Sequence, residues 1–171
     1  MHLNLKVIAC KWCGRIGCLV LHGFLKGYEE ASQDKFNRAH RILCSSRRKR
    51  GDKGCGKTFS VYFASVITNV RISAESLWKF LSAVAGGEQK IKVFRSLLPQ
   101  CFHDRSIHRW WQRFVRIRQS AIRSLLCTIC PPPVIENRSP EIQTILHLEK
   151  AFSSCACPVA AFHLLFQCPF L

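Results

Sequence analysis

Two cysteine-containing turns constrain this chain more than any other feature of its sequence. In the first, two residues separate the cysteines; in the second, ten residues separate them; glycine follows each pair. The cysteines are Cys10, Cys13, Cys44 and Cys55, and the glycines are Gly14 and Gly56. Four thiolates close a tetrahedral zinc (Zn2+) site with no open position for catalysis. Residues 5–63 contain few apolar residues for a core, so we expect zinc to supply much of their folding free energy.

Other cysteines lie close to these turns or far along the chain. Cys18 and His22 are alternative ligands beside the first turn. A distant group has no glycine after its pairs and comprises Cys127, Cys130, Cys155, Cys157 and Cys168. We interpret this group as core or interface thiols, with a second metal site as the alternative. Because no signal peptide is recognisable, the 11 cysteines are expected to be reduced, which favours a cytoplasmic protein.

Positive charge is confined to the first two-thirds of the chain. The 26 basic and 10 acidic residues give a net charge of +16. Residues 1–60 contribute 13 − 4 = +9, residues 61–126 contribute 11 − 3 = +8, and residues 127–171 contribute 2 − 3 = −1. This asymmetry predicts a part that faces a polyanion and a neutral tail. The three aspartates do not follow apolar strands, so two-metal strand-transfer chemistry is not expected.

Residues 73–126 have the apolar periodicity of helices. The predicted helices are 73–86, 88–98 and 104–126. The third should carry an apolar stripe of Ile107, Trp110, Phe114, Ile117 and Ala121. A helix, a short turn, a second helix and then a basic helix form a helix-turn-helix pattern.

Basic side chains in two places are candidate DNA contacts. On the third helix they are accompanied by a glutamine, and the set is Arg105, Arg109, Gln112, Arg113 and Arg116. Arginine can read guanine and glutamine can read adenine in the major groove. A loop in the second cysteine turn adds Arg47, Arg48, Lys49, Arg50 and Lys53 as phosphate contacts. The alternative for both sets is an ordinary solvated surface.

The same loop matches a nucleotide-binding pattern that we reject. Residues 51–58 read Gly-Asp-Lys-Gly-Cys-Gly-Lys-Thr, which satisfies the phosphate-loop pattern. That loop must follow a buried apolar strand and open a helix. Here a run of serines, arginines and lysine precedes it. The glycines are better explained by the turn around the metal.

The chain is therefore predicted to be an α+β protein with three parts. Residues 5–63 form a small β zinc ribbon, residues 73–126 form the helix-turn-helix, and residues 134–171 form a helical tail. The prolines at 131–133 separate the last two parts. The tail either docks on the helices or forms a homodimer face. Apolar runs end well short of the ~20 residues that span a bilayer, so no membrane partner is expected.

The two turns resemble the N-terminal zinc ribbon of bacterial insertion-sequence transposases. The resemblance rests on Cys10-x-x-Cys13-Gly14, on the run Cys55-Gly-Lys-Thr-Phe-Ser60, and on the Arg109-Trp110 pair of a following helix-turn-helix. It covers residues 5–126. The sequence departs from the family in the basic insertion at 45–54 and in lacking an acidic catalytic domain. The resemblance implies binding of duplex DNA for element-end binding or regulation, without strand transfer. It leaves open an accessory protein, a stand-alone reading frame whose partner is a separate catalytic transposase subunit, and a degraded relic.

Two other functional classes remain open at this stage. One is an RNA-binding or ribosome-associated zinc-ribbon protein, for which Phe59, Tyr62 and Phe63 would form an aromatic platform. The other is a hydrolase that uses one of the 7 histidines. No serine or cysteine stands at a spacing that supports such catalysis, so the protein is not expected to be an enzyme.

Overall fold

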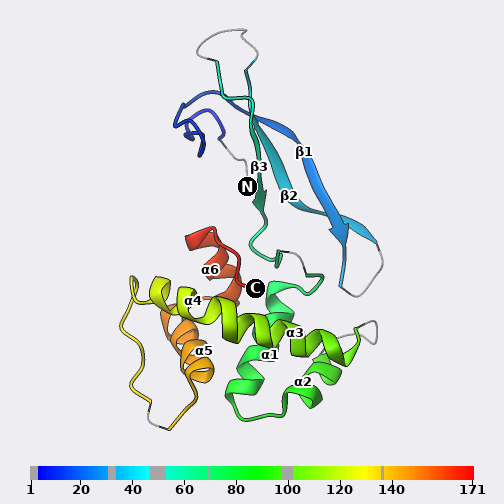
Figure 1. The fold of residues 1–171 in the computed structure, drawn as a ribbon, viewed down its shortest axis with the longest axis vertical. Helices are drawn as coiled ribbons and strands as arrows, with labels where there is room; N and C mark the ends of the chain where they lie inside the picture. The colour runs from blue at the N-terminus through cyan, green and yellow to red at the C-terminus, as the bar shows by residue number, and fades with distance from the viewer. Residues whose placement is uncertain (1–3, 31–33, 47–52, 69, 98–101, 136) are drawn as a thin grey trace. The chain divides into compact units, whose positions relative to one another are not determined.

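The computed structural model describes residues 4–30, 34–46, 53–68, 70–97, 102–135 and 137–171. The chain divides into two compact units. Unit 1 comprises residues 1–28 and 34–63, and unit 2 comprises residues 29–33 and 64–171. Strands in unit 1 precede helices in unit 2 along the chain, which confirms the α+β class (Figure 1). None of the described helices combines the length and the apolar character needed to cross a membrane.

Unit 1 is built on a three-stranded antiparallel sheet in the order β1-β2-β3 (Figure 1). The strands are β1 (Leu19–Tyr28), β2 (Lys35–Cys44) and β3 (Thr58–Tyr62). The register places Leu19 opposite Cys44 and Leu43 opposite Thr58. The metal-ligand candidate Cys44 therefore ends the central strand.

The hydrophobic core of unit 1 is small. Its buried cluster consists of Cys10, Cys18, Leu19, Ile42 and Cys44. Two of these five residues belong to the predicted metal site. The sheet leaves large apolar side chains on its surface, among them Leu21 and Phe24. Apolar burial alone thus contributes little to the stability of this unit.

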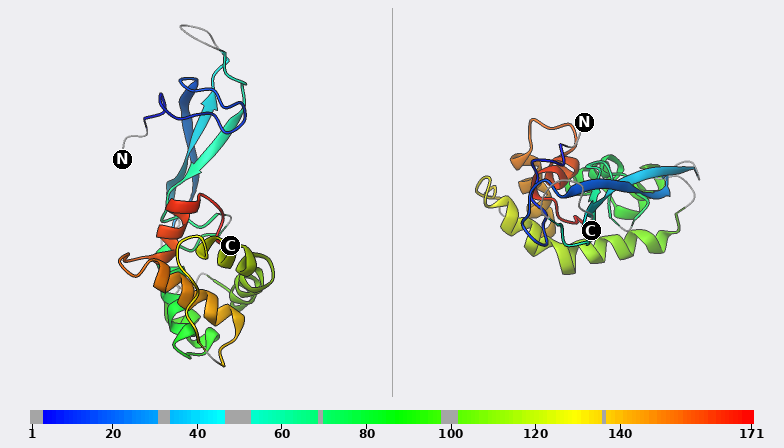
Figure 2. Two further views of the ribbon diagram at one scale, coloured as in Figure 1. Left: turned by 90° about the vertical axis from the view of Figure 1, so that its left-hand side faces the viewer. Right: turned by 90° about the horizontal axis from the view of Figure 1, so that it is seen from above.

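Unit 2 is helical. Its elements are α1 (Ala74–Ala85), α2 (Lys90–Leu97), α3 (Asp104–Arg113), the π-helical turn η1 (Phe114–Arg118), α4 (Gln119–Leu126), α5 (Pro140–Ala151) and α6 (Pro158–Phe166). The α3, η1 and α4 segments run on as one continuous helix, drawn green to yellow-green in Figure 2. The sequence prediction of one helix over 104–126 anticipated this stretch.

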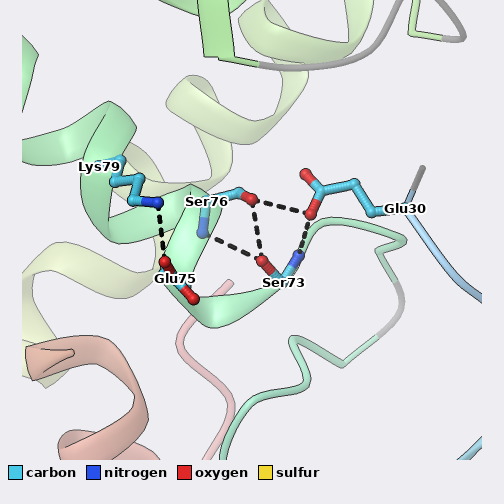
Figure 3. A network of polar contacts seen from close by, with 5 residues as sticks. All are labelled: Glu30, Ser73, Glu75, Ser76 and Lys79. Carbon is cyan, nitrogen blue, oxygen red and sulfur yellow. Dashed lines mark hydrogen bonds and ion pairs between the residues drawn. The ribbon is translucent and has the colours of Figure 1, made fainter. Parts of the chain in front are cut away.

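Helix α1 begins as predicted, at a serine cap. The Ser73 Oγ accepts a hydrogen bond of 3.0 Å from the backbone N–H of Ser76. Glu30 adds its carboxylate, which accepts from the Ser73 backbone N–H at 3.2 Å and from the Ser76 hydroxyl at 2.8 Å (Figure 3). A negative charge at a helix N-terminus is favourable because unpaired N–H groups point toward it.

The apolar stripe predicted for the third helix is wrong beyond its first half. Ile117 is 65% exposed and Ala121 is exposed, whereas Ile122 and Leu126 are buried. In a regular α-helix, Ile107 and Leu126 would point about 100° apart. The wider turn η1 takes up about one extra residue and returns both side chains to the same face.

The tail is part of the same unit as the earlier helices. Ile145 and Leu148 from α5, and Val159 and Phe162 from α6, join the core that α1 to α4 build. The chain also buries Phe170 there. Residues 134–171 are thus not a separate part, because their apolar faces complete the core of unit 2.

Candidate metal centre

Four cysteine side chains meet at one end of the sheet in unit 1. The Sγ atoms of Cys10, Cys13, Cys44 and Cys55 all lie within 4.8 Å of one another. The Sγ atoms of Cys10 and Cys55 lie 3.9 Å apart, and those of Cys13 and Cys44 lie 3.7 Å apart. A zinc tetrathiolate with bonds of about 2.3 Å has sulfur–sulfur edges of about 3.8 Å. The cluster could therefore hold a metal ion, and its dimensions fit zinc.

The first turn is fixed by three hydrogen bonds around Cys10. The backbone N–H of Cys10 donates to the Arg15 carbonyl at 2.8 Å, and the Gly14 N–H donates to the Cys10 carbonyl at 2.7 Å. The Trp12 N–H donates to the Cys10 sulfur at 3.4 Å. Gly14 has a φ of +71°, which favours glycine. The backbone thus aims a donor at the Cys10 sulfur.

The second turn repeats this geometry around Cys44. The Cys44 N–H donates to the Lys57 carbonyl at 3.0 Å, and the Gly56 N–H donates to the Cys44 carbonyl at 2.9 Å. The Cys55 N–H donates to the Cys44 sulfur at 3.3 Å. Gly56 has a φ of +73°, almost equal to that of Gly14. The two turns are therefore equivalent despite their different lengths.

The ten-residue insertion leaves the second turn intact because a backbone hydrogen bond joins the two ends of the insertion. The Gly54 N–H donates to the Ser45 carbonyl at 2.8 Å. A Cβ atom at Gly54 would lie 2.5 Å from the Cys44 sulfur, so only glycine fits at this neck. The ten-residue spacing between Cys44 and Cys55 is thus compatible with a metal-binding turn.

The thiols of Cys10 and Cys44 have opposite pKa shifts. Burial acts to raise the pKa of Cys10, but hydrogen bonds from the Trp12 and Cys13 backbone N–H groups outweigh it and lower the pKa to about 6. Burial raises the pKa of Cys44 to about 12, against a hydrogen bond from the Cys55 N–H. A metal ion displaces thiol protons on binding, so loading the site releases protons.

The alternative ligands lie outside the cluster. Cys18 is buried in the core of unit 1, and His22 is exposed within β1, at the register shift next to Gly23. Within the described part of the chain, the four-cysteine cluster is the one group able to hold a metal. The distant cysteines Cys127, Cys130, Cys155, Cys157 and Cys168 are not brought into such a group.

The candidate DNA contacts are divided between the units. On the α3–η1 helix all five side chains are exposed, namely Arg105, Arg109, Gln112, Arg113 and Arg116. Lys53 is exposed in unit 1, and Arg47, Arg48, Lys49 and Arg50 lie outside the described residues. The rejected phosphate-loop pattern leads into strand β3 instead of a helix. That placement lacks the helix N-terminus that a phosphate loop requires.

One residue at the metal centre was not predicted from the sequence. Trp12 lies between Cys10 and Cys13 and is 54% exposed. The ammonium groups of Lys11 and Lys57 lie 4.9 Å and 5.2 Å from the centre of its ring. The available signal was an aromatic residue between two metal-ligand candidates on a tight turn. Such a turn offers a side chain little to pack against, so the ring is left exposed.

No protein-family model, curated protein or solved structure matches this chain. What the structure supports of the predicted resemblance is a four-cysteine cluster on a small three-stranded antiparallel sheet that is followed by helices.

Proposed function

We propose that this protein binds duplex DNA through the exposed face of α3 and η1, and that zinc in the four-cysteine cluster is structural. The carrying observation is the outward position of all five candidate contacts on that helix. Ile107, Trp111 and Phe114 occupy its buried face. An α-helix with arginine and glutamine on one side fits the major groove. The protein binds DNA and carries out no strand transfer itself.

The pairing at the start of α3 supports this proposal. Asp104 is the acidic residue in the first turn of the helix, and it forms an ion pair with Arg95 of α2. The side-chain hydrogen bond and the charge of Arg95 lower the pKa of Asp104. The negative charge nearest the arginine face is therefore neutralised, and repulsion of phosphate is reduced.

The DNA of this proposal is the end of a mobile element. This part follows from the resemblance of the cysteine turns to transposase zinc ribbons, and it makes a separate catalytic transposase subunit the partner. Zinc would stabilise the fold of unit 1 without contacting the nucleic acid itself.

Fluorescence anisotropy on the zinc-loaded full chain tests the proposal. The probes are duplex DNA from the flanking locus, a scrambled duplex and RNA. If Arg109 reads a base, Arg109→Gln should weaken binding to the locus duplex about 5- to 150-fold. If Arg109 contacts a phosphate, the substitution should weaken binding to all duplexes equally. Arg138→Gln, an exposed arginine of unit 2 outside this face, is the matched control. Equal affinity of wild type and Arg109→Gln for every duplex would contradict the proposal.

RNA binding is the second candidate, and exposed aromatic side chains on the sheet favour it. Phe24 and Phe36 are exposed. Phe59, Tyr62 and Phe63, which we expected to form the platform, are half-buried. Tighter binding of single-stranded RNA than of locus duplex would replace the leading proposal with this one.

A homodimer is proposed through the part of the tail that the core leaves exposed. Phe162 and Leu148 are buried within unit 2, whereas Leu164 and Leu165 of α6 are exposed. Removing the tail would open the core, so a surface substitution is the better test. Light scattering on Leu164→Glu should show half the mass of the wild-type protein. A wild-type protein that already has the monomer mass would contradict the dimer.

A further inference from the structure

The two cysteine turns carry an aromatic and basic surface that the duplex proposal does not use. It consists of Lys11, Trp12, Arg15, Lys53 and Lys57, and we call it the knuckle surface. All five side chains are exposed. They come from both turns, so the surface exists only when the four cysteines are together. It lies wholly in unit 1 and is distinct from the α3–η1 face in unit 2.

Trp12 is exposed although its backbone is held firmly. Its N–H donates to the Cys10 sulfur, and the residues on either side belong to the metal turn. The side chain makes no contribution to the buried cluster of unit 1. An exposed indole on a fixed turn offers a flat apolar face at little cost in conformational entropy. Its ring is therefore a candidate stacking platform, and a base that stacks there takes the place of the lysine ammonium groups that lie over it.

Cations from both turns surround this ring. Lys11 follows the first ligand and Lys57 follows Gly56 of the second turn, and both ammonium groups lie within 5.2 Å of the ring centre. Lys11 also lies 5.1 Å from the ring centre of Phe59. The Arg15 guanidinium donates a hydrogen bond to the Lys53 carbonyl and so joins the two turns.

The charge of the metal centre does not cancel these cations. Zinc with four thiolates carries a net charge of about −2. Four cationic side chains of the knuckle surface leave an excess of about +2, and residues 10–16 and 53–59 contain no acidic side chain. An aromatic platform with surplus positive charge matches a base that carries phosphates on both sides.

We propose that the knuckle surface binds unpaired nucleotides, with one base stacked on Trp12 and the flanking phosphates held by Lys11 and Lys57. Bases inside a duplex cannot stack on a protein side chain because their faces are covered by neighbouring base pairs. The ligand is therefore a single strand or an overhang. This inference goes beyond the proposed function and does not depend on duplex binding by α3.

The experiment measures anisotropy of labelled oligothymidine of about ten nucleotides, oligouridine of equal length, and blunt and overhanging duplexes. Trp12→Ala should weaken single-strand and overhang binding about 5- to 150-fold and leave blunt-duplex binding unchanged. Trp12→Phe should restore part of the loss. For single-strand binding, Lys11→Gln and Lys57→Gln should each reduce the slope of log K against the logarithm of the salt concentration by about 0.7.

Tyr28 provides the matched control within the same unit. It is 40% exposed, and the Lys35 ammonium group lies 5.8 Å from its ring centre. Tyr28→Ala should leave single-strand binding unchanged. Zinc content measured for every variant separates a lost contact from an unfolded unit 1.

Three outcomes would overturn the inference. In the first, oligothymidine and oligouridine do not bind the wild-type protein. In the second, Trp12→Ala and Tyr28→Ala reduce binding equally. In the third, an oligoglutamate peptide of equal charge displaces the oligonucleotide, which would assign the surface to an acidic protein partner. Arg109→Gln should not affect single-strand binding, so failure of the duplex proposal is recognised separately.

Discussion

The two units of this protein are stabilised by different means. Among the residues that the structure describes, the buried cluster of unit 2 contains 22 apolar residues drawn from α1 to α6 and the segments beside them. In unit 1 the buried cluster contains five, of which Cys10 and Cys44 are candidate metal ligands. A core of the first kind supports a domain by itself, whereas one of the second kind requires a metal or another cross-link.

This difference also explains where the surface chemistry lies. Unit 1 does not rely on a buried sheet face, so its strands and turns leave aromatic side chains such as Trp12 and Phe24 exposed. Unit 2 buries aromatic rings such as that of Phe114. This ring stacks on that of Phe170, with 5.9 Å between the ring centres. A unit that a metal holds together can therefore expose apolar side chains to a ligand. A unit that a hydrophobic core holds together needs such side chains for its own folding.

Removal of one ligand should have the largest effect. Cys44→Ser leaves three thiolates and takes away the sulfur that accepts the Cys55 N–H. We expect unit 1 to unfold while unit 2 stays folded. The indole N–H signals of the 4 tryptophans report this in one 1H–15N spectrum, because Trp12 lies in unit 1 and the others in unit 2. Loss of all four signals would show that the units are not independent.

Truncation of a side chain in the core of unit 2 should destabilise unit 2 and leave unit 1 unchanged. Phe114 is fully buried, so Phe114→Ala should cost about 3–5 kcal/mol of the free energy of unfolding of unit 2. Zinc content should not change. Ile117→Ala on the exposed side of the same turn is the control and should change stability by less than about 0.5 kcal/mol. Denaturant unfolding followed by the signals of Trp78 and Trp111 measures both, and zinc loss in Phe114→Ala would contradict the comparison.

Strain in the metal turn should weaken zinc binding by a smaller amount. Gly56 has a positive φ that costs an L-residue about 1–2 kcal/mol, so Gly56→Ala should lower zinc affinity about 5- to 30-fold. Gly87→Ala is the control, because Gly87 has a φ of +100° but lies in unit 2. Competition with a chromogenic chelator measures the affinity. An equal loss in both variants would mean that the metal site depends on unit 2.

Deletion of Ile117 should have the smallest effect. This removes one residue from η1 and allows an unbroken α-helix from Ile107 to Leu126, with both still on the buried face. Unit 2 should keep its fold and most of its stability. Insertion of an alanine after Ile117 is the matched comparison and should destabilise the unit, because it turns Ile122 and Leu126 away from the core. Equal effects of deletion and insertion on the thermal midpoint would refute this account of η1.

Local patterns in the sequence were sufficient to identify a small β ribbon, the start of the first helix and the four cysteines. Cys10, Cys13 and Gly14 form a pattern whose geometry is local, and the same holds for Ser73 at the start of α1. The second turn was harder, because no rule of spacing shows that an insertion closes on itself between Ser45 and Gly54. That closure depends on a backbone hydrogen bond that only the fold displays.

The buried face of the long helix could not be read from the sequence. Trp110 and Trp111 are adjacent, and apolar residues at both Ile117 and Ile122 fit two different helical registers. The structure selects Trp111 and Ile122, since η1 shifts the register between them. The position of the tail was equally hidden, because burial of Phe162 depends on contacts with helices far away in the sequence.

Zinc removal from the intact protein tests the central claim most directly. A chelator is added to the zinc-loaded wild-type chain while the tryptophan indole signals and the released metal are measured together. We expect release of one zinc per chain, loss of the folded Trp12 signal, unchanged signals from Trp78, Trp110 and Trp111, and recovery when zinc is restored. A folded Trp12 signal that persists after the metal is gone would contradict it.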